Sequence, residues 1–499
     1  MNNPGTEETR SYRNIFKATT LFGGVQVYQI LISIIRSKFV AVLLGTAGMG
    51  IQGLLQSSIS MVQNFTSLGL AASAVRDVSE ANGSGDINRT ARTVTALRRL
   101  TWITGLLGML VVIFLSPVLS KTSFGNRDYI LPLIFLSCIP LIDQLGTGNT
   151  VVLQGMRRLK DLARASTIGV TLGLVISVPI YYFWGIKGIV PTLILSSLSA
   201  FIINAFFAHK VSLPRVSMSV RETLNCGKSM MIMGVAFSVS GIVVTTTSYI
   251  VRSYIMRHGG ASMVGLYQAG FAIIGTYVGM VFSAIGTDFY PRLAAVNQDN
   301  EACRSIVSQQ GEIASHILGP ILCVCALTMP IILRILYSDQ FLDSCPYVLW
   351  CCPGMMLKLA SWLIAYQFVA KAESVIFMET ELFSGVVNVI AYIIGYNLGG
   401  LAGLGMAFSI SYLLYLVLVY VISARRHGFR FSDSFLKSFL FQTGLVMVSI
   451  LGISLVASEF KYVICSLSTI VSCIVAVYVL NKKMDLLNML KSQFNKNNQ

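Results

Sequence analysis

Apolar segments long enough to cross a membrane follow one another along almost the whole chain. We count roughly fourteen such runs between about residues 19 and 481, each able to span about 30 Å of hydrocarbon as a helix. Only 12% of the residues are charged, against about a quarter in soluble domains. The approximate spans are 19–44, 49–74, 98–120, 129–152, 165–184, 188–208, 230–255, 262–286, 310–335, 345–370, 376–398, 401–424, 438–457 and 461–481. These features predict an all-α, polytopic integral membrane protein.

The net charge of +16 is concentrated in the loops of one side of the predicted bundle. If the N-terminus is cytoplasmic, most Lys and Arg residues fall in cytoplasmic loops, and the outer loops hold few. Those few are Lys121, Arg127, Lys187, Arg257, Arg334 and Lys461. This asymmetry fits the positive-inside rule with both termini in the cytoplasm. No basic patch is interleaved with aromatic residues, so the charge does not indicate a nucleic-acid partner.

Short motifs in the first half of the chain recur in the second half, about 215 residues later. The matching pairs are Arg36-Ser37 with Arg252-Ser253, Gly50-Ile51 with Gly265-Leu266, Arg76 with Arg292, and Gly185-Ile186-Lys187-Gly188 with Gly400-Leu401-Ala402-Gly403. Each half holds an even number of spans, so the repeats are parallel. We predict an N-terminal six-helix lobe over 1–225, a C-terminal six-helix lobe over 226–433, and two additional helices with a cytoplasmic tail over 434–499.

Cationic side chains inside the spans are the first candidates for a binding site. A charge at the centre of a spanning helix costs about 2.5–3.5 kcal/mol and usually faces a wet interior. Arg36 and Arg252, one from each lobe, are predicted to present guanidinium forks to a diphosphate. Lys38 either joins this group or extends to the outer interface, and the second alternative is also open for Arg252.

Asp143 and Lys358 are equivalent in the repeat but opposite in charge. One interpretation is structural: each is neutralised locally, or the two meet as an ion pair between lobes. The functional interpretation, which we favour, is that Lys358 contacts the cargo and Asp143 couples transport to protons or another cation. His316 could titrate near neutral pH, although a lone buried His is more often a satisfied core residue.

Polar and aromatic residues within the spans could line a cavity that accepts sugars. Gln52, Tyr267, Gln268 and Tyr366 are predicted to contact substrate, with Trp362 and Gln367 as further candidates. Each of them taken singly is more often a helix-packing contact. No P-loop, HExxH motif or nucleophile elbow appears, and the loops are short. We therefore expect neither an enzyme nor a bound cofactor.

Several motifs resemble Wzx-type flippases of O-antigen and related polysaccharide repeat units, in the multidrug/oligosaccharidyl-lipid/polysaccharide exporter superfamily. They are Val264-Gly265-Leu266-Tyr267-Gln268, Tyr290-Pro291-Arg292-Leu293, Leu336-Tyr337-Ser338-Asp339-Gln340-Phe341, and Tyr366-Gln367-Phe368-Val369-Ala370-Lys371-Ala372. The resemblance covers roughly residues 10–425. The last two spans depart from the twelve-span pattern of several members.

The resemblance implies a V-shaped, two-lobed protein of the bacterial inner membrane. Its cargo would be an undecaprenyl-diphosphate-linked oligosaccharide, moved from the cytoplasmic to the periplasmic leaflet by alternating access, as in lipopolysaccharide biosynthesis. In such proteins a cationic cavity holds the anionic head group. Expected partners are membrane lipids, H⁺ or Na⁺ as a coupling ion in an antiporter, and other membrane proteins of polysaccharide assembly.

Three other functions remain open. A multidrug or metabolite exporter of the same superfamily would need acidic groups for organic cations, and Asp143 is nearly alone among the carboxylates inside the spans. A peptidoglycan-precursor flippase would use the same physical chemistry. A membrane glycosyltransferase or polymerase normally needs a larger extramembrane loop or an acidic metal site than these short loops provide.

Overall fold

The computed structural model describes residues 4–214, 216–456 and 460–484, and within these ranges it is helical throughout, with no strand. The first elements are α1 (Pro4–Thr66), α2 (Leu70–Gly83), α3 (Ile87–Phe124), α4 (Ile130–Leu136), α5 (Cys138–Gly155), α6 (Leu159–Trp184), the 3₁₀ turn η1 (Gly185–Gly188), α7 (Ile189–His209) and α8 (Val220–Ala272). They are followed by the π-helical turn η2 (Ile273–Val278), α9 (Met280–Ala295), α10 (Asn300–Leu336), the 3₁₀ turn η3 (Asp339–Ser344), α11 (Cys345–Ala370), α12 (Ser374–His427), α13 (Asp433–Leu455) and α14 (Phe460–Met484). The predicted all-α class is confirmed.

Ten helical stretches in these described ranges are long and apolar enough to cross a membrane. Four of them contain a break at glycine, namely at Gly45 in α1, at Gly185 between α6 and α7, at Gly260 in α8, and at Gly399 and Gly400 in α12. An unbroken helix as long as α12 would extend about 80 Å, far beyond a bilayer. Division at the four breaks yields the fourteen expected segments, and the separate crossing of each remains a prediction.

The internal repeat is visible in backbone dihedral angles. Gly45 and Gly260 both have positive φ, at 65° and 79°, and Gly185 and Gly400 follow at 53° and 56°. Even the non-glycine pair Arg157 and Ala372 shares this conformation, at 55° and 58°. Each pair is separated by the offset of the sequence repeat. The duplicated motifs therefore mark duplicated turns between helices.

The chain divides into two compact units, Met1–Gly265 and Leu266–Gln499, called unit 1 and unit 2 below. Unit 1 includes most of α8, whose Tyr249 hydroxyl lies 2.7 Å from the hydroxyl of Thr122 and 3.0 Å from that of Ser123 at the end of α3. The division into a lobe over 1–225, a lobe over 226–433 and an appendix over 434–499 remains a prediction.

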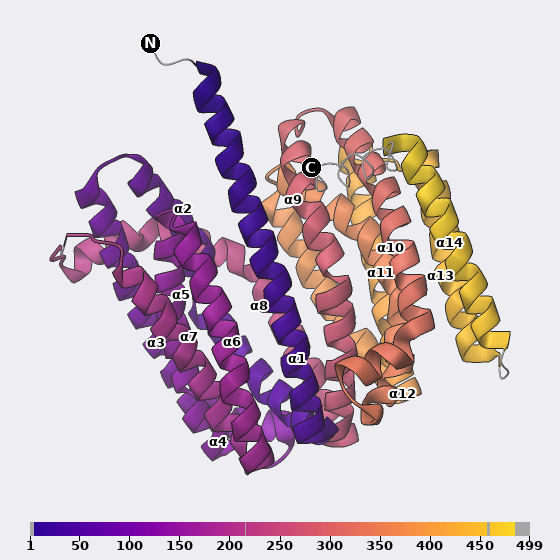
Figure 1. Cartoon of the computed structure of the whole chain (residues 1–499), viewed down its shortest axis with the longest axis horizontal. Coiled ribbons are helices and arrows are strands. Elements are labelled where there is room, and N and C mark those ends of the chain that lie inside the picture. Colours follow the sequence, from indigo (N-terminus) through magenta and orange to yellow (C-terminus); the bar gives the residue numbers. More distant parts are fainter. Residues whose placement is uncertain (1–3, 215, 457–459, 485–499) are drawn as a thin grey trace, which may run out of the picture. The chain divides into compact units, whose positions relative to one another are not determined.

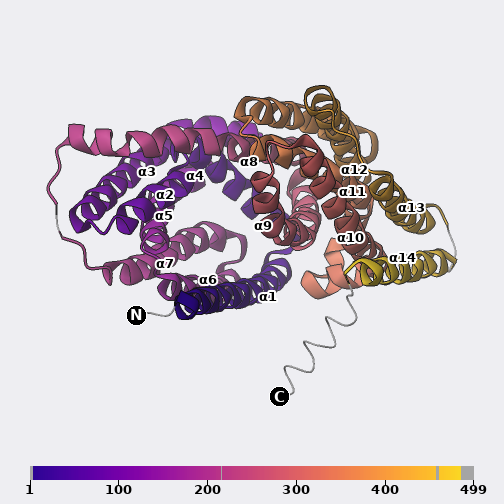
Figure 2. The ribbon, with the colours of Figure 1, turned by 90° about the horizontal axis from the view of Figure 1, so that it is seen from above.

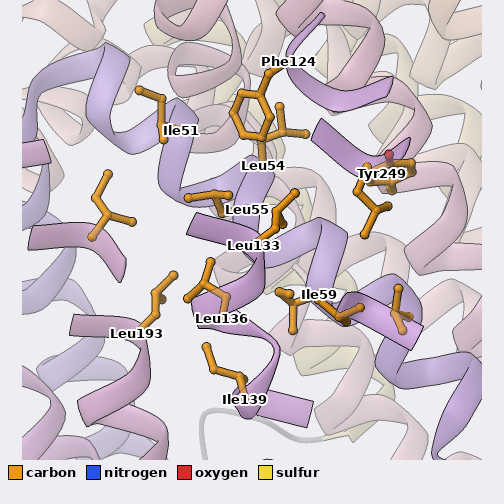
Figure 3. Close-up of a cluster of buried hydrophobic side chains, with 14 of the residues drawn as sticks. Ile51, Leu54, Leu55, Ile59, Phe124, Leu133, Leu136, Ile139, Leu193 and Tyr249 are labelled. Atoms are coloured by element: carbon orange, nitrogen blue, oxygen red, sulfur yellow. The ribbon is translucent and has the colours of Figure 1, made fainter. Parts of the chain in front are cut away.

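Within unit 1, α1 packs on α6, α6 on α7, α7 on α5, and α5 on α3 (Figures 1 and 2). The core of this unit is a cluster of aliphatic side chains closed by Tyr249, shown in Figure 3. Leu54, Leu55, Leu133 and Leu136 are 0–1% exposed there. These contacts hold the second arm of α1 against α4 and α8, while its first arm, which carries Arg36, lies along α6.

Within unit 2, α10 contacts α11, α13 and α14, and the last two helices pack on each other (Figures 1 and 2). The helix α12 folds back on itself at its glycine break, because the backbones of Gly395 and Gly403 touch. Since residues eight apart in a straight helix are about 12 Å apart, this contact requires a hairpin. Because α13 and α14 pack on α10 as well as on each other, these two helices are part of unit 2.

Candidate functional site

Arg36 lies against α6 in unit 1. Its Nη1 is 3.5 Å from the place that a Cβ on Gly173 would occupy, and the guanidinium is close to the ring hydroxyl of Tyr181. The Tyr181 hydroxyl is buried, and its polar neighbours are Arg36 and Thr192. The same two helices also meet at Tyr28 of α1 and Thr171 of α6, whose hydroxyls lie 2.8 Å apart. No ion pair to Arg36 occurs among the residues that the structure describes.

Arg252, its equivalent in the repeat, has different surroundings. It is 7% exposed on α8, among the buried side chains of Tyr249, Val251 and Ile255, and has interactions of its own. Lys38 is half-buried and likewise has a partner. Arg36 is therefore the more accessible of the two repeated arginines. A shared diphosphate site formed by both remains a prediction.

Asp143 on α5 is half-buried and lies beside Gln63 of α1 and Ser197 of α7. In the described part of the chain no Lys, Arg or His forms an ion pair with it. A carboxylate taken out of water without a cationic partner favours protonation or the binding of a cation. These neutral polar neighbours suit either occupant.

Lys358 begins an accessible stripe on α11, which is otherwise deeply buried. Of the most apolar stretch of this helix, 78% of the residues are buried. Lys358, Trp362 and Tyr366 are half-buried exceptions, and their spacing of four residues places them on one helix face. We call these three residues the α11 stripe.

Aromatic side chains of α9 and α12 surround the α11 stripe. The Lys358 Nζ is 5.3 Å from the ring centre of Phe282 and 5.5 Å from that of Tyr412. The Trp362 and Tyr366 rings are 4.3 Å apart, and Tyr290 meets Tyr366 edge to face at 5.9 Å. The stripe thus combines one cation with flat aromatic faces on one side of the helix.

Glu381 on α12 adds a carboxylate that the sequence analysis did not include. Its Oε1 accepts a hydrogen bond of 3.0 Å from the Tyr415 hydroxyl, and it attracts Lys358 electrostatically without forming an ion pair. The prediction that Asp143 is nearly alone among carboxylates within the spans is wrong, because Glu312 on α10 also lies within one, 6% exposed. The signal was present, since both glutamates fall inside predicted apolar runs.

The remaining candidates have mixed surroundings. Tyr267 is 2% exposed and packs on Tyr347 at 5.2 Å, so it contributes to the core of unit 2. Gln268 and Gln52 are half-buried, and no donor to the Gln52 Oε1 occurs among the described residues. His316 is 3% exposed on α10 and contacts Gln442 of α13. As substrate or ion contacts, these residues remain predictions.

Comparisons with known proteins agree with the fold. An inward-facing multidrug resistance MATE family transporter of the MOP superfamily matches with a TM-score of 0.66 and 15% identity, over 80% of this chain and 94% of that chain. The lipid II flippase MurJ in an inward closed conformation matches with a TM-score of 0.66 and 14% identity, over 94% and 100%. A MOP superfamily transporter from Pyrococcus furiosus matches with a TM-score of 0.55 and 14% identity, over 82% and 94%.

No curated protein matches the sequence closely. The sequence profile of one family, described as polysaccharide biosynthesis protein, matches residues 22–346. That stretch covers well over half of the chain and runs from the first arm of α1 to the start of α11. The chain therefore has the fold of the MOP superfamily, spans the membrane several times, and belongs to the polysaccharide biosynthesis protein family.

Proposed function

We propose that this protein flips an undecaprenyl-diphosphate-linked oligosaccharide, such as an O-antigen repeat unit, from the cytoplasmic to the periplasmic leaflet of a bacterial inner membrane by alternating access. The family description and the fold shared with a lipid II flippase support this function. The observation that carries it is the position of Lys358. Within the described ranges this cation forms no ion pair, and it lies on the aromatic-lined face of α11.

Each part of the α11 stripe suits one part of such a cargo. The Lys358 ammonium group is a compact charge that binds phosphate oxygens. Outside the stripe, in unit 1, Arg36 carries a guanidinium fork that can bind two phosphate oxygens at once. The faces of Trp362 and Tyr366 can pack against the C–H groups of a sugar ring. Keeping a cation in an apolar helix costs about 2.5–3.5 kcal/mol, which binding of an anion offsets.

Asp143 and His316 are the proposed coupling residues, with H⁺ or Na⁺ as the ion. Asp143 supports this role because Gln63 and Ser197 provide neutral oxygen and nitrogen atoms around its carboxylate. An ion bound there would neutralise the carboxylate during the return step of the transport cycle. Both termini are proposed to face the cytoplasm.

The proposal is tested in liposomes containing the purified protein and a fluorescent lipid-diphosphate oligosaccharide, with leaflet exposure as the readout. Lys358→Ala should slow flipping about tenfold or more, the effect of losing about 1.4 kcal/mol of binding to the head group. Lys187→Ala, which removes the same charge from an exposed turn, is the matched control. Equal flipping rates in Lys358→Ala, Lys187→Ala and the unmodified protein would refute the site.

The two arginines are tested in the same assay. Arg36→Ala should slow flipping without loss of thermal stability, because its side chain is half-buried. Arg252→Ala is combined with an unfolding measurement, since Arg252 is 7% exposed and its loss affects packing. If Arg36→Ala flips normally, the diphosphate site does not include this residue.

Glu381 beside Lys358 favours a second candidate, a multidrug or metabolite exporter. Fluorescent organic cations supplied to the same liposomes distinguish it, because a flippase does not accumulate them. A peptidoglycan precursor supplied in place of the oligosaccharide tests the third candidate. Preference for that precursor would indicate a function in cell-wall synthesis with the same binding site.

A further inference from the structure

Seven polar side chains follow one another where the last two helices pack on α10, and the ribbons of α10, α13 and α14 are neighbours in Figures 1 and 2. We call this group the polar seam. Its members are Glu312, His316 and Cys323 of α10, Gln442 and Ser449 of α13, and Ser472 and Lys483 of α14. All except Lys483 are at most 6% exposed. So dense a polar contact in an apolar bundle calls for an explanation.

The register between α10 and α13 keeps polar side chains opposite one another along the seam. Glu312 meets Ser438, His316 meets Gln442, and Cys323 meets Ser449. Hydrogen bonds between spanning helices stabilise packing by only about 0.6 kcal/mol on average. Serines and amides would suffice for that purpose. Packing alone does not require the carboxylate of Glu312, the imidazole of His316 and the ammonium group of Lys483.

Glu312 lies where the seam opens to a cavity. Its Oε2 is 2.6 Å from the Lys483 Nζ, and its Oε1 accepts a hydrogen bond of 2.9 Å from Ser434. A cavity of about 420 Å³ reaches this pair and is also lined by Glu301, Arg304 and the serines around the start of α13. Water can therefore reach the carboxylate from the end of the bundle that carries Lys483.

His316 lies one helical turn deeper than Glu312 and has a defined tautomer. Ser472 donates to the Gln442 Oε1 at 2.6 Å, so the Gln442 amide nitrogen faces the His316 Nδ1 at 3.0 Å and donates to it. The Nδ1 atom thus accepts, and the proton of the neutral ring is on Nε2. That Nε2 is buried and has no hydrogen-bond partner in the described part of the chain.

We propose that Glu312 and His316 form a proton-binding site, in which Lys483 and protonated His316 compete as counter-ions for the same carboxylate. The charged groups that face the imidazole are Glu312 from its own helix and Lys483 from α14. From α11, the apolar Leu363 packs at Gly311, one turn away. Arg304 and Glu301 lie at the mouth of the cavity.

Proton uptake can be written atom by atom. A proton enters from water in the cavity at Glu312 and passes one turn deeper to the His316 Nδ1. The Gln442 amide turns so that its Oε1 accepts from this N–H, and the Ser472 hydroxyl accepts from the amide nitrogen. The charge of the imidazolium then attracts the Glu312 carboxylate, four residues earlier on the same helix face. Lys483 loses its counter-ion and is released, so proton binding loosens the end of α14. As a coupling site this inference rests on the proposed transport function, whereas proton binding itself does not.

Nitrogen NMR of the full-length protein in lipid nanodiscs, with ¹⁵N-labelled histidine, tests proton binding directly. The chain has four histidines, and His316→Asn identifies the signal. In Lys483→Gln the pH of proton uptake at His316 should rise by about one unit, because the positive charge that repels the imidazolium is removed. Glu312→Gln should lower it. Lys482→Gln, which removes the neighbouring exposed charge, should leave it unchanged.

Two outcomes overturn the proposal. One is a His316 signal that stays neutral between pH 5 and pH 9 in both the unmodified protein and Lys483→Gln. The other is an equal response to Lys482→Gln and Lys483→Gln. If His316→Asn does not fold, a hydrophobic carbodiimide replaces the NMR measurement. The pH dependence of its reaction with Glu312, located by mass spectrometry, reports proton binding at the carboxylate.

The link to transport is tested separately in the flipping assay. With an imposed pH gradient, Lys483→Gln should shift the pH dependence of flipping in the same direction as the NMR signal. A shifted NMR signal with unchanged flipping would refute coupling and retain the proton site. Absence of flipping in the unmodified protein would refute the proposed function, and the NMR result would stand alone.

Discussion

The hairpin in α12 permits a graded prediction about stability. A Cβ added at Gly403 would lie 1.8 Å from the carbonyl oxygen of Gly395, whereas real Cβ contacts stay beyond 3.0 Å. The two arms of the hairpin must therefore separate by more than 1 Å to admit Gly403→Ala. At the equivalent Gly188 of unit 1, the nearest atoms are the Cγ2 and the carbonyl oxygen of Ile180, both 2.9 Å away, so a shift of a few tenths of an ångström is enough.

The magnitudes follow from packing and helix propensity. Forced separation of packed backbones typically costs about 1–3 kcal/mol, and Gly→Ala in a helix returns up to about 1 kcal/mol. We expect a net loss of roughly 2 kcal/mol for Gly403→Ala and little change for Gly188→Ala. Gly444 on α13 has no atom within 4 Å of a new Cβ, so Gly444→Ala should gain up to about 1 kcal/mol.

Thermal unfolding in detergent, followed with a dye that fluoresces on reaction with thiols, measures these differences. The buried Cys323, Cys351 and Cys352, each 0% exposed, become reactive only on unfolding. A unit of this size loses about 2–4 °C per kcal/mol, so Gly403→Ala and Gly444→Ala should differ by about 6 °C or more. The reasoning is refuted if Gly188→Ala costs as much as Gly403→Ala, or if Gly444→Ala destabilises the protein.

Three further predictions use the same two assays. Asp143→Asn should abolish the response of flipping to a pH or sodium gradient, and a preserved response would remove Asp143 from coupling. Burial raises the pKa of Asp77 in α2, outside the spans. The folded state therefore binds this proton more tightly than the unfolded state, and stability falls as pH rises through the raised pKa. Asp77→Asn should accordingly stabilise the protein at pH 8, with a gain that shrinks towards pH 4. Ser423→Ala leaves the buried Oε1 of Gln367, bonded at 2.8 Å, without its donor, and should cost about 1–3 kcal/mol while cargo flipping per folded protein stays constant.

Hydropathy and the internal repeat were sufficient to predict the helical class, because a bilayer accepts few alternatives to apolar helices. Element ends were less predictable. The predicted span 49–74 includes the end of α1 at Thr66, where Leu68 and Gly69 turn the chain with φ of 51° and 60°. Hydropathy averages over such a turn, since the flanking residues are apolar on both sides.

The assignment of α8 shows what span counting leaves out. By number, this helix opens the second half of the chain, yet most of it belongs to unit 1. The contacts of Tyr249 with Thr122 and Ser123 join residues more than a hundred positions apart. Only the folded chain shows such pairs, because neither periodicity nor composition depends on them.

The site was predictable to the extent that one rule, the rarity of charges inside spans, was applied to every residue. It identified Asp143 and Lys358, and complete use of it would have added Glu312 and Glu381. This rule does not predict which side chains these residues contact. That His316 meets Gln442 depends on the register of α10 against α13, which their separate sequences do not specify.

The two repeats keep their backbone turns but not their side-chain chemistry. Positive φ recurs at Gly45 and Gly260, although Asp143 in one unit corresponds to Lys358 in the other. A turn between antiparallel helices imposes the same steric demand wherever it occurs, whereas the fold does not require a particular charge inside a helix. The differing charges therefore reflect demands other than folding. At this pair of equivalent positions we infer different tasks, in which Asp143 of unit 1 is suited to a coupling ion and Lys358 of unit 2 is suited to the anionic head group of a glycolipid.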